Sequence, residues 1–284
     1  MAELVESPIS IPNTCKLRIK SKNNLEYEIS IALPPSYYES DNKYPVLYLL
    51  DSNQFFTVVS GILSSRYNWQ KVNMIIEAVP EVILVGIGYP TTKYTEVLTY
   101  RSRDYTPEID EEEYIEMSDE LGCDPEYKPN SGGAAEFHRF IKDILMPYIE
   151  SSYRVNANDK TIAGHSYGGL FSAYVLFNEP RTFNRYVISS PSLWYKQGVF
   201  FGYEAEYSKK HESLETRVFI GSGSNETNEI RNILEGVRRL VETLDRRQYK
   251  GLVYEWAVFS DEGHVSVIPA SFMRGILSVY KQTP

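Results

Sequence analysis

Short apolar runs alternate with amphipathic segments along most of this chain, and that alternation constrains the fold more than any other feature. Runs such as Val46–Leu50 and Val82–Ile87 are apolar throughout, which is typical of strands covered on both faces. Segments with apolar residues three and four positions apart lie between such runs and predict helices. The alternation predicts an α/β fold with a mainly parallel, doubly wound sheet, whose functional loops follow the carboxyl ends of strands.

The first two expected strands flank the turn Lys22-Asn23-Asn24, so they predict an antiparallel N-terminal hairpin. The expected strands are Cys15–Lys20, Tyr27–Ala32, Val46–Leu50, Val82–Ile87, Lys160–Ala163, Arg185–Ser189, Arg217–Gly221 and Val253–Phe259. The expected helices are Asn68–Val79, a helix after Gly133 that Pro147 kinks, Tyr167–Phe177, Glu229–Asp245 and Val267–Gln282.

Two stretches do not fit the alternation. Residues 91–132 contain ten acidic residues and no Lys or Arg between Glu108 and Glu126, and residues 192–213 are rich in Trp, Tyr and Phe. Both follow strands, so we expect lid-like loops or pocket walls, although a solvated acidic face would also explain the first stretch. The length of 284 residues predicts a single domain over 1–284 with these two insertions.

Composition and charge exclude several classes of function. The formal net charge is −9, and the acidic run accounts for it, so no basic face for nucleic acid or for an anionic membrane is implied. No apolar stretch is long enough to span a bilayer, and the first ten residues lack the pattern of a signal peptide. Cys15 and Cys123 form neither a disulfide framework nor a zinc site, so we expect a cytoplasmic protein. The oligomeric state stays open.

Gly164-His165-Ser166-Tyr167-Gly168 matches the GxSxG pattern. About 0.1 matches are expected by chance in a chain of this composition, and this one lies between an expected strand and an expected helix. Such a tight turn strains the backbone of the serine and presents its Oγ at the positive end of the helix. The motif predicts Ser166 as a nucleophile. The alternative is a glycine-rich turn between strand and helix that has the same sequence pattern and serves only packing.

A serine at neutral pH needs a base to remove its proton. His264 follows the last expected strand, where an α/β-hydrolase places its base. His165 belongs to the motif itself and is expected to point away from the serine, while His138 lies in a helix and His211 in a charged stretch. The chain order therefore favours His264, and an exposed loop histidine is the alternative.

An acid that orients the histidine is expected after the strand Arg217–Gly221. Glu226 is the first carboxylate in that loop and is our candidate, with Glu229 as the alternate and Asp261 as a weaker one. A glutamate before a helix is also a favourable first-turn charge, so the chain order alone supports this choice.

A tetrahedral oxyanion needs two convergent backbone N–H donors. Tyr167, directly after the nucleophile, is expected to supply one, and Asn53, in the loop after Val46–Leu50, the other. Trp194, Tyr105 and Arg101 are the candidates for binding substrate. Core packing is the alternative for the aromatic residues, which also include Tyr89, Tyr94, Tyr195, Phe200 and Phe201. For Arg101 and Arg103, an ion pair with Asp104 is the alternative.

Three motifs together resemble a known family. Tyr44–Asp51 reads YPVLYLLD, Gly164–Phe171 reads GHSYGGLF and Ser189–Trp194 reads SSPSLW. These residues look like the esterase D-type "putative esterase" family of α/β-hydrolases, which includes siderophore, feruloyl and acetylxylan esterases and the mycolyltransferases. The resemblance spans about residues 10–280 and keeps the order of the motifs, so it is more specific than GxSxG alone.

The resemblance implies an α/β-hydrolase fold over about residues 10–280 and a catalytic carboxylate after the late strand, which supports Glu226. The chain departs from the family at Asp51-Ser52, where many members read Asp-Gly, and in a longer, glycine-rich acid loop, so the choice between Glu226 and Glu229 stays open. By the same resemblance, the remaining roles fall to Ser166 as nucleophile, His264 as base, and Tyr167 and Asn53 as oxyanion donors.

The sequence thus predicts a serine carboxylic-ester hydrolase that acts through an acyl-enzyme on a small or aromatic ester, with a siderophore trilactone among the candidates. Such chemistry needs no metal and no organic cofactor, and its partner is the small-molecule ester. Two alternatives remain at this point. The chain could transfer its acyl group to an acceptor other than water, or it could be a catalytically silent binding protein on a hydrolase fold.

Overall fold

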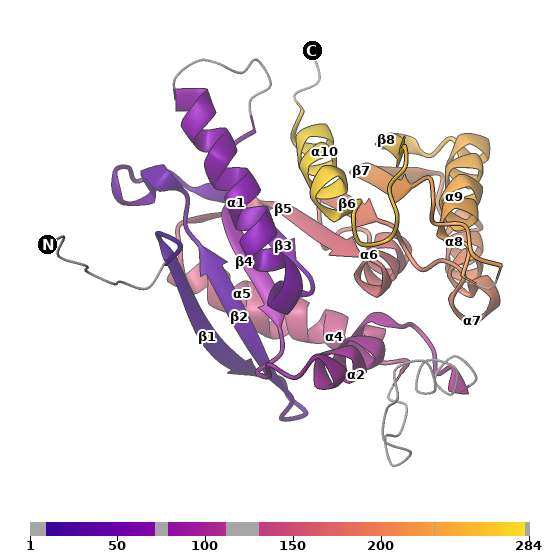
Figure 1. Cartoon of the computed structure of the whole chain (residues 1–284), viewed down its shortest axis with the longest axis horizontal. Helices are drawn as coiled ribbons and strands as arrows, with labels where there is room; N and C mark the ends of the chain where they lie inside the picture. Colours follow the sequence, from indigo (N-terminus) through magenta and orange to yellow (C-terminus); the bar gives the residue numbers. More distant parts are fainter. Residues whose placement is uncertain (1–9, 72–78, 112–130, 230, 282–284) are drawn as a thin grey trace, which may run out of the picture.

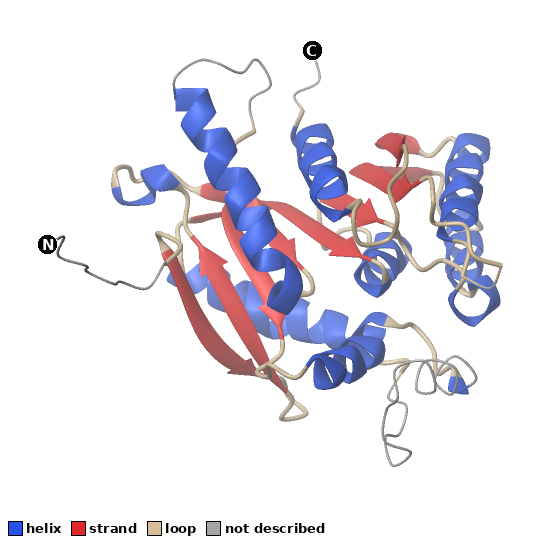
Figure 2. Ribbon diagram, viewed as in Figure 1, coloured by secondary structure: helices blue, strands red, loops and turns tan. Residues whose placement is uncertain are grey.

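The computed structural model describes residues 10–71, 79–111, 131–229 and 231–281. Its eight-stranded sheet has the order β1-β2-β4-β3-β5-β6-β7-β8, and helices cover both faces of the sheet (Figure 2). β2 pairs antiparallel with both β1 and β4, whereas every other pair of neighbouring strands is parallel. The predicted α/β-hydrolase fold is therefore confirmed, including the antiparallel hairpin at the N-terminal edge.

The strands are close to their expected positions and are longer than expected at β5, β7 and β8. The strands are β1 (Thr14–Lys20), β2 (Glu26–Ala32), β3 (Tyr44–Leu49), β4 (Ile83–Gly88), β5 (Val155–His165), β6 (Arg185–Ser189), β7 (Ser213–Gly223) and β8 (Lys250–Phe259). The helices are η1 (Pro35–Tyr38), α1 (Ser52–Lys71), α2 (Tyr94–Tyr105), α4 (Ala134–Phe140), η2 (Ile141–Leu145), α5 (Met146–Ser152), α6 (Tyr167–Asn178), α7 (Tyr195–Gly198), α8 (Phe200–Ser208), α9 (Ile233–Arg247) and α10 (Ile268–Tyr280).

Two apolar cores hold the layers together. On one face of the sheet, α1 and α10 lie side by side (Figure 1) and bury residues such as Phe55 and Phe272. On the other face, α4, α6, α8 and α9 bury a larger core that contains Phe137 and Phe171. Coverage of both faces explains why the central strands are apolar throughout. No helix within the described ranges is both long and apolar enough to cross a membrane.

The helix between β3 and β4 corrects one prediction. We expected it at Asn68–Val79, but α1 begins at Ser52, directly after β3, and residues 72–78 of the expected range lie outside the described part of the chain. The Asp51 carbonyl accepts the first helical hydrogen bonds, 2.9 Å from the nitrogen of Gln54 and 3.0 Å from that of Phe55. Asp, Ser and Asn favour helix N-termini as well as loops, which is why this segment looked like a loop.

Individual side chains explain where α9 begins and where the helix after Gly133 becomes irregular. α9 starts at Ile233, four residues later than expected, because the side chain of Asn232 caps it by accepting from the Glu235 N–H at 2.9 Å. The helix after Gly133 is interrupted by a π-helical segment, η2, and resumes as α5 with Pro147 in its first turn. Proline has no N–H, so it suits the start of a helix, and the expected irregularity lies one turn before it.

The two expected insertions contain ordered helices where they are described. Residues 94–105 form α2, which packs against α4 and α6, while 112–130, most of the acidic run and Cys123, lie outside the described residues. The second stretch forms α7 and α8. Glu108 joins the two stretches, since its carboxylate accepts from Lys196 Nζ at 2.7 Å and its carbonyl from the Tyr195 hydroxyl at 2.9 Å.

Candidate active site

A cavity of about 780 Å³ lies at the carboxyl end of the parallel strands. Six of the eight predicted site residues line it, although they come from distant parts of the chain. They are Arg101, Ser166, Tyr167, Trp194, Glu226 and His264. Asn53 and Tyr105 are not among its lining residues. Within the described ranges, no group of three or more His, Cys, Asp or Glu side chains is arranged to hold a metal ion.

Ser166 occupies the sharp turn between β5 and α6. Its backbone has φ 61° and ψ −120°, a strained conformation for a residue with a side chain. The turn is possible because residue 164 is a glycine. A Cβ at this position would overlap the carbonyl of Gly168. Ser166 therefore stands at the N-terminus of α6, where the helix dipole favours developing negative charge. Its Oγ lies 3.4 Å from the hydroxyl of Ser192.

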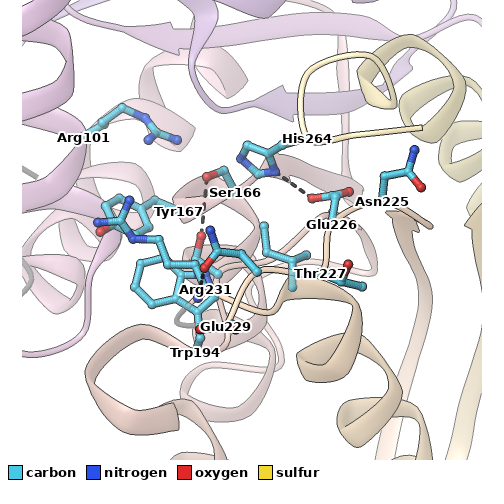
Figure 3. Close-up of a pocket in the computed structure, with 13 residues that line it drawn as sticks. Arg101, Ser166, Tyr167, Trp194, Asn225, Glu226, Thr227, Glu229, Arg231 and His264 are labelled. Atoms are coloured by element: carbon cyan, nitrogen blue, oxygen red, sulfur yellow. Dashed lines mark hydrogen bonds and ion pairs between the residues drawn. The ribbon is translucent and has the colours of Figure 1, made fainter. Parts of the chain in front are cut away.

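His264 lies between Ser166 and Glu226 (Figure 3). Its Nδ1 is 2.7 Å from Glu226 Oε2, and the other carboxylate oxygen accepts from Ser190 Oγ at 2.7 Å and from the Gly223 N–H at 2.6 Å. Glu226 is thus buried but fully hydrogen-bonded, as a buried carboxylate must be. With Nδ1 held by the acid, Nε2 is the ring nitrogen left to face the serine.

The alternative acids occupy different environments. Glu229 lines the cavity but is exposed, and Asp261 is exposed in the loop before His264, where its N–H donates to Ser224 Oγ at 2.9 Å. Of the three carboxylates, Glu226 carries the bond to the histidine.

His165 packs behind the ring of His264, with their ring centroids 4.5 Å apart. It is buried, its Nδ1 lies 3.0 Å from Ser189 Oγ, and Phe55 meets it edge-on. Burial lowers the pKa of His165 well below its usual value, and the neighbouring His264 lowers it further. A neutral ring therefore supports His264 from the side away from solvent.

Arg101 forms a buried ion pair with Asp51. Its Nε and Nη2 donate to the two carboxylate oxygens at 2.9 and 3.0 Å, and the Asp51 side chain is fully buried. Burial opposes the charge on Arg101, but the facing carboxylate outweighs it and raises the pKa of the guanidinium. Arg103, two residues along α2, pairs instead with Asp104 at 2.6 and 2.9 Å.

Tyr105 belongs to the core beneath the cavity and not to its wall, which corrects our expectation that it binds substrate. Its side chain is 0% exposed, and its hydroxyl accepts from the Asp51 N–H at 3.0 Å. The core-packing alternative also describes Tyr89, Tyr195 and Phe200, which are all buried. Trp194 does line the cavity, with the guanidinium of Arg231 over its ring at 5.5 Å.

Asn53 lies in the first turn of α1, and its side chain faces a second, smaller pocket. Its Oδ1 accepts from the Tyr89 N–H at 2.8 Å, and its Nδ2 donates to the carbonyls of Tyr89 and Thr91 at 2.9 and 3.3 Å. The side chain thus ties the start of α1 to the end of β4. A first-turn backbone N–H has no acceptor within its own helix, which keeps Asn53 eligible as an oxyanion donor.

Sequence reasoning missed several residues that the structure brings to the site. Ser190 holds Glu226, Ser192 lies beside Ser166, and Asp51 holds Arg101. A signal was available for the two serines, since Ser189–Trp194 follows a strand end and was one of the motifs that carried the resemblance. Asp51 ends another of these motifs, Tyr44–Asp51, but its partner Arg101 lies 50 residues away and no local pattern pairs the two residues.

The fold, the strained serine turn and the paired histidine and carboxylate define an α/β-hydrolase of the esterase class. The model of the family described as "Putative esterase" matches residues 21–266, and the chain belongs to this family. It is an ester hydrolase, which confirms the predicted class of enzyme.

Several proteins are similar to this chain over nearly its whole length. The ferri-bacillibactin esterase BesA of Bacillus subtilis (strain 168) is 32% identical over 94% of this chain and 89% of its own length. A siderophore enterobactin esterase of Emericella nidulans is 28% identical over 95% of this chain and 94% of its own length. The crystal structure of the BES protein from Bacillus cereus matches with a TM-score of 0.82 and 27% identity, covering 99% of this chain and 100% of that one.

Proposed function

We propose that this enzyme cleaves the ester bonds of siderophores, with Ser166 as nucleophile, His264 as base and Glu226 as the acid that orients the base. The observation that carries the proposal is the 2.7 Å contact between His264 Nδ1 and Glu226 in the cavity that Ser166 also lines. This pairing leaves Nε2 available for the serine proton, as the chemistry of a serine hydrolase requires.

In the proposed reaction, Ser166 Oγ attacks the ester carbonyl carbon while His264 takes the hydroxyl proton. The carbonyl oxygen becomes an oxyanion that accepts hydrogen bonds from the backbone N–H groups of Tyr167 and Asn53. Collapse of this intermediate breaks the ester C–O bond, and His264 returns the proton to the leaving alkoxide. Water then attacks the acyl-enzyme with His264 again as base, which releases the acid and restores Ser166.

The substrate class follows from the relatives and the cavity together. Proteins similar to this chain over nearly its whole length are named for the siderophores bacillibactin and enterobactin. The cavity has an aromatic wall at Trp194, with the Arg231 guanidinium 5.5 Å from the ring centroid, and about 780 Å³ of space. Such a site suits a large ester that carries aromatic or anionic groups.

Chromatography of enterobactin digests tests the proposal, with the iron-free and the ferric forms supplied separately. Wild type is expected to convert the cyclic ester into linear products, and Ser166→Ala to leave it intact. Cleavage of p-nitrophenyl butyrate without cleavage of either siderophore form would overturn the substrate class while leaving the esterase. Products esterified to an added alcohol, in preference to water, would indicate an acyltransferase, and a folded wild type inactive on every ester would contradict the enzyme itself.

A further inference from the structure

Arg101 contacts both of the turns that carry the proposed oxyanion donors. Its guanidinium holds the Asp51 carboxylate with two hydrogen bonds, of 2.9 and 3.0 Å, and Asp51 leads directly into the first turn of α1, which contains Asn53. The same guanidinium lies 5.4 Å from the centroid of the Tyr167 ring, within reach of a cation–π interaction. One side chain from α2 therefore bridges the start of α1 and the start of α6.

The Asp51 turn needs such support because its backbone is strained. Asp51 has φ 55°, a left-handed conformation that costs free energy for a residue with a side chain. Arg101 holds its carboxylate and the Tyr105 hydroxyl holds its N–H, both from α2. The turn also packs closely on the serine motif, since a Cβ at Gly168 would lie 3.2 Å from Asp51 Oδ2. A small shift of Asp51 would therefore displace both proposed donors.

Two roles for Arg101 are consistent with its place in the wall of the cavity (Figure 3). It could bind an anionic group of the substrate, or it could hold the protein around the reacting carbonyl. The contacts favour the second role, because the fork of Nε and Nη2 already binds Asp51 and the residue is only 9% exposed. With that fork occupied, an anionic group of the substrate could reach only the remaining N–H groups of Nη1 and Nη2.

We propose that Arg101 is a positioning residue that locks the Asp51–Asn53 turn and the Tyr167 turn into one arrangement, so that their N–H groups converge on the oxyanion. This inference rests on the proposed function. It predicts that Arg101 acts on the transition state and not on the binding of the ground-state ester, whatever the charge of that ester.

Arg101→Lys tests the inference, because lysine keeps the positive charge but cannot bind Asp51 through a planar fork. The matched control is Arg103→Lys, which breaks an equivalent fork on the same helix, with Asp104 as partner. Kinetics are measured on p-nitrophenyl acetate, which is neutral, and on p-nitrophenyl hemisuccinate, which is anionic. A trifluoromethyl ketone, whose tetrahedral adduct with serine carries an oxyanion, supplies an inhibition constant for each variant.

Arg101→Lys is expected to lower kcat on both esters by about 10- to 100-fold, with KM within about two-fold, and to weaken the ketone by the same factor. Arg103→Lys is expected to keep kcat within about two-fold of wild type. A loss confined to the KM of the anionic ester would make Arg101 a substrate ligand and overturn the inference. An equal loss of kcat in Arg103→Lys would attribute the effect to a weakened α2 and overturn it as well.

Asp51→Asn alters the other partner of the same ion pair, and it is the variant to measure if Arg101→Lys does not fold. The Asp51 side chain is fully buried, so it has no direct contact with substrate, and the inference predicts a similar loss of kcat on the neutral ester. Full activity in a folded Asp51→Asn would contradict the positioning role. The proposed function fails separately, if Ser166→Ala keeps its activity or if wild type cleaves no ester.

Discussion

Two buried carboxylates each hold a residue of the cavity wall, and the two partners are of opposite kinds. Glu226 holds His264, whose imidazole can accept and release a proton, whereas Asp51 holds Arg101, whose guanidinium keeps its charge. His264 has 40% of its side chain exposed and faces the cavity, while Arg101 has only 10% exposed. The His264–Glu226 pair can take part in proton transfer, whereas the Arg101–Asp51 pair can only fix the positions of the segments that carry it.

This difference shows that similar contacts contribute to catalysis in separable ways. Loss of the Glu226 pair is expected to disturb proton transfer, because the histidine loses the partner that orients it and stabilises its charged form. Loss of the Asp51 pair is expected to disturb the positions of the oxyanion donors, because Arg101 joins their two turns. The predictions below separate the two effects from each other and from simple substrate binding.

The largest expected effect comes from the nucleophile, which neither pair can replace. Ser166→Ala is expected to lower kcat on p-nitrophenyl butyrate by about 10⁴-fold or more, since no acyl-enzyme can form. Circular dichroism checks that the fold is retained. A folded variant that keeps a tenth of the wild-type rate would place the nucleophile elsewhere.

Glu226→Gln is expected to lower kcat by about 10²- to 10⁴-fold, because glutamine neither stabilises the imidazolium nor selects the required tautomer. Glu229→Gln is the comparison, because Glu229 lines the same cavity but is exposed and lies in the same loop. We expect it to cost less than about 10-fold. If the larger loss falls on Glu229→Gln, the acid has been assigned to the wrong residue.

A wall residue that touches neither carboxylate should affect binding alone. Trp194→Ala is expected to raise KM for an aromatic ester such as p-nitrophenyl benzoate by about 5- to 20-fold, with kcat little changed, because the indole offers a large apolar contact. p-Nitrophenyl acetate, which lacks the acyl ring, measures the part of the effect that comes from the leaving group. An unchanged KM on both esters would remove Trp194 from the substrate site.

The smallest expected effect is on the pH dependence of stability and comes from a buried histidine outside the His264–Glu226 and Arg101–Asp51 pairs. Burial lowers the pKa of His138, whose Nε2 lies 3.0 Å from Thr182 Oγ1. Below about pH 6.5, His138 therefore takes up a proton more readily in the unfolded chain than in the folded protein. The contribution of His138 to the free energy of unfolding is highest above that pH and decreases as the pH falls.

His138→Gln, which cannot titrate, is expected to reduce the fall in unfolding free energy between pH 7.5 and 5.5 by on the order of 1 kcal/mol. Urea titrations at each pH measure that fall, and His211→Gln, at an exposed position, is the control. Equal falls in wild type and His138→Gln would show that His138 is not held neutral by the fold.

The Ser166 side of the site was predictable because its signals are local. The GxSxG turn, the loop that carries His264 and the first carboxylate after a strand are all short patterns in defined places along the chain. The fold class followed from the alternation of apolar runs and amphipathic segments, and most strands lie within a few residues of their expected bounds.

The Arg101 side could not be predicted in the same way. Its partner Asp51 is 50 residues away, so their contact exists only once α2 has packed beside the start of α1. The residues at the start of α1 had the composition of a loop, and α2 lay inside a stretch that we expected to be an insertion. Tyr105 had the residue type of a pocket wall, but its burial depends on tertiary packing.

The central claim is that Ser166 is a nucleophile activated by the His264–Glu226 pair. The most direct measurement is labelling with a fluorophosphonate, followed by intact-mass analysis and peptide mapping. We predict one adduct per chain, on Ser166, with no adduct in Ser166→Ala and much slower labelling in Glu226→Gln. An adduct on another residue, or a folded wild type that does not react, would contradict the account.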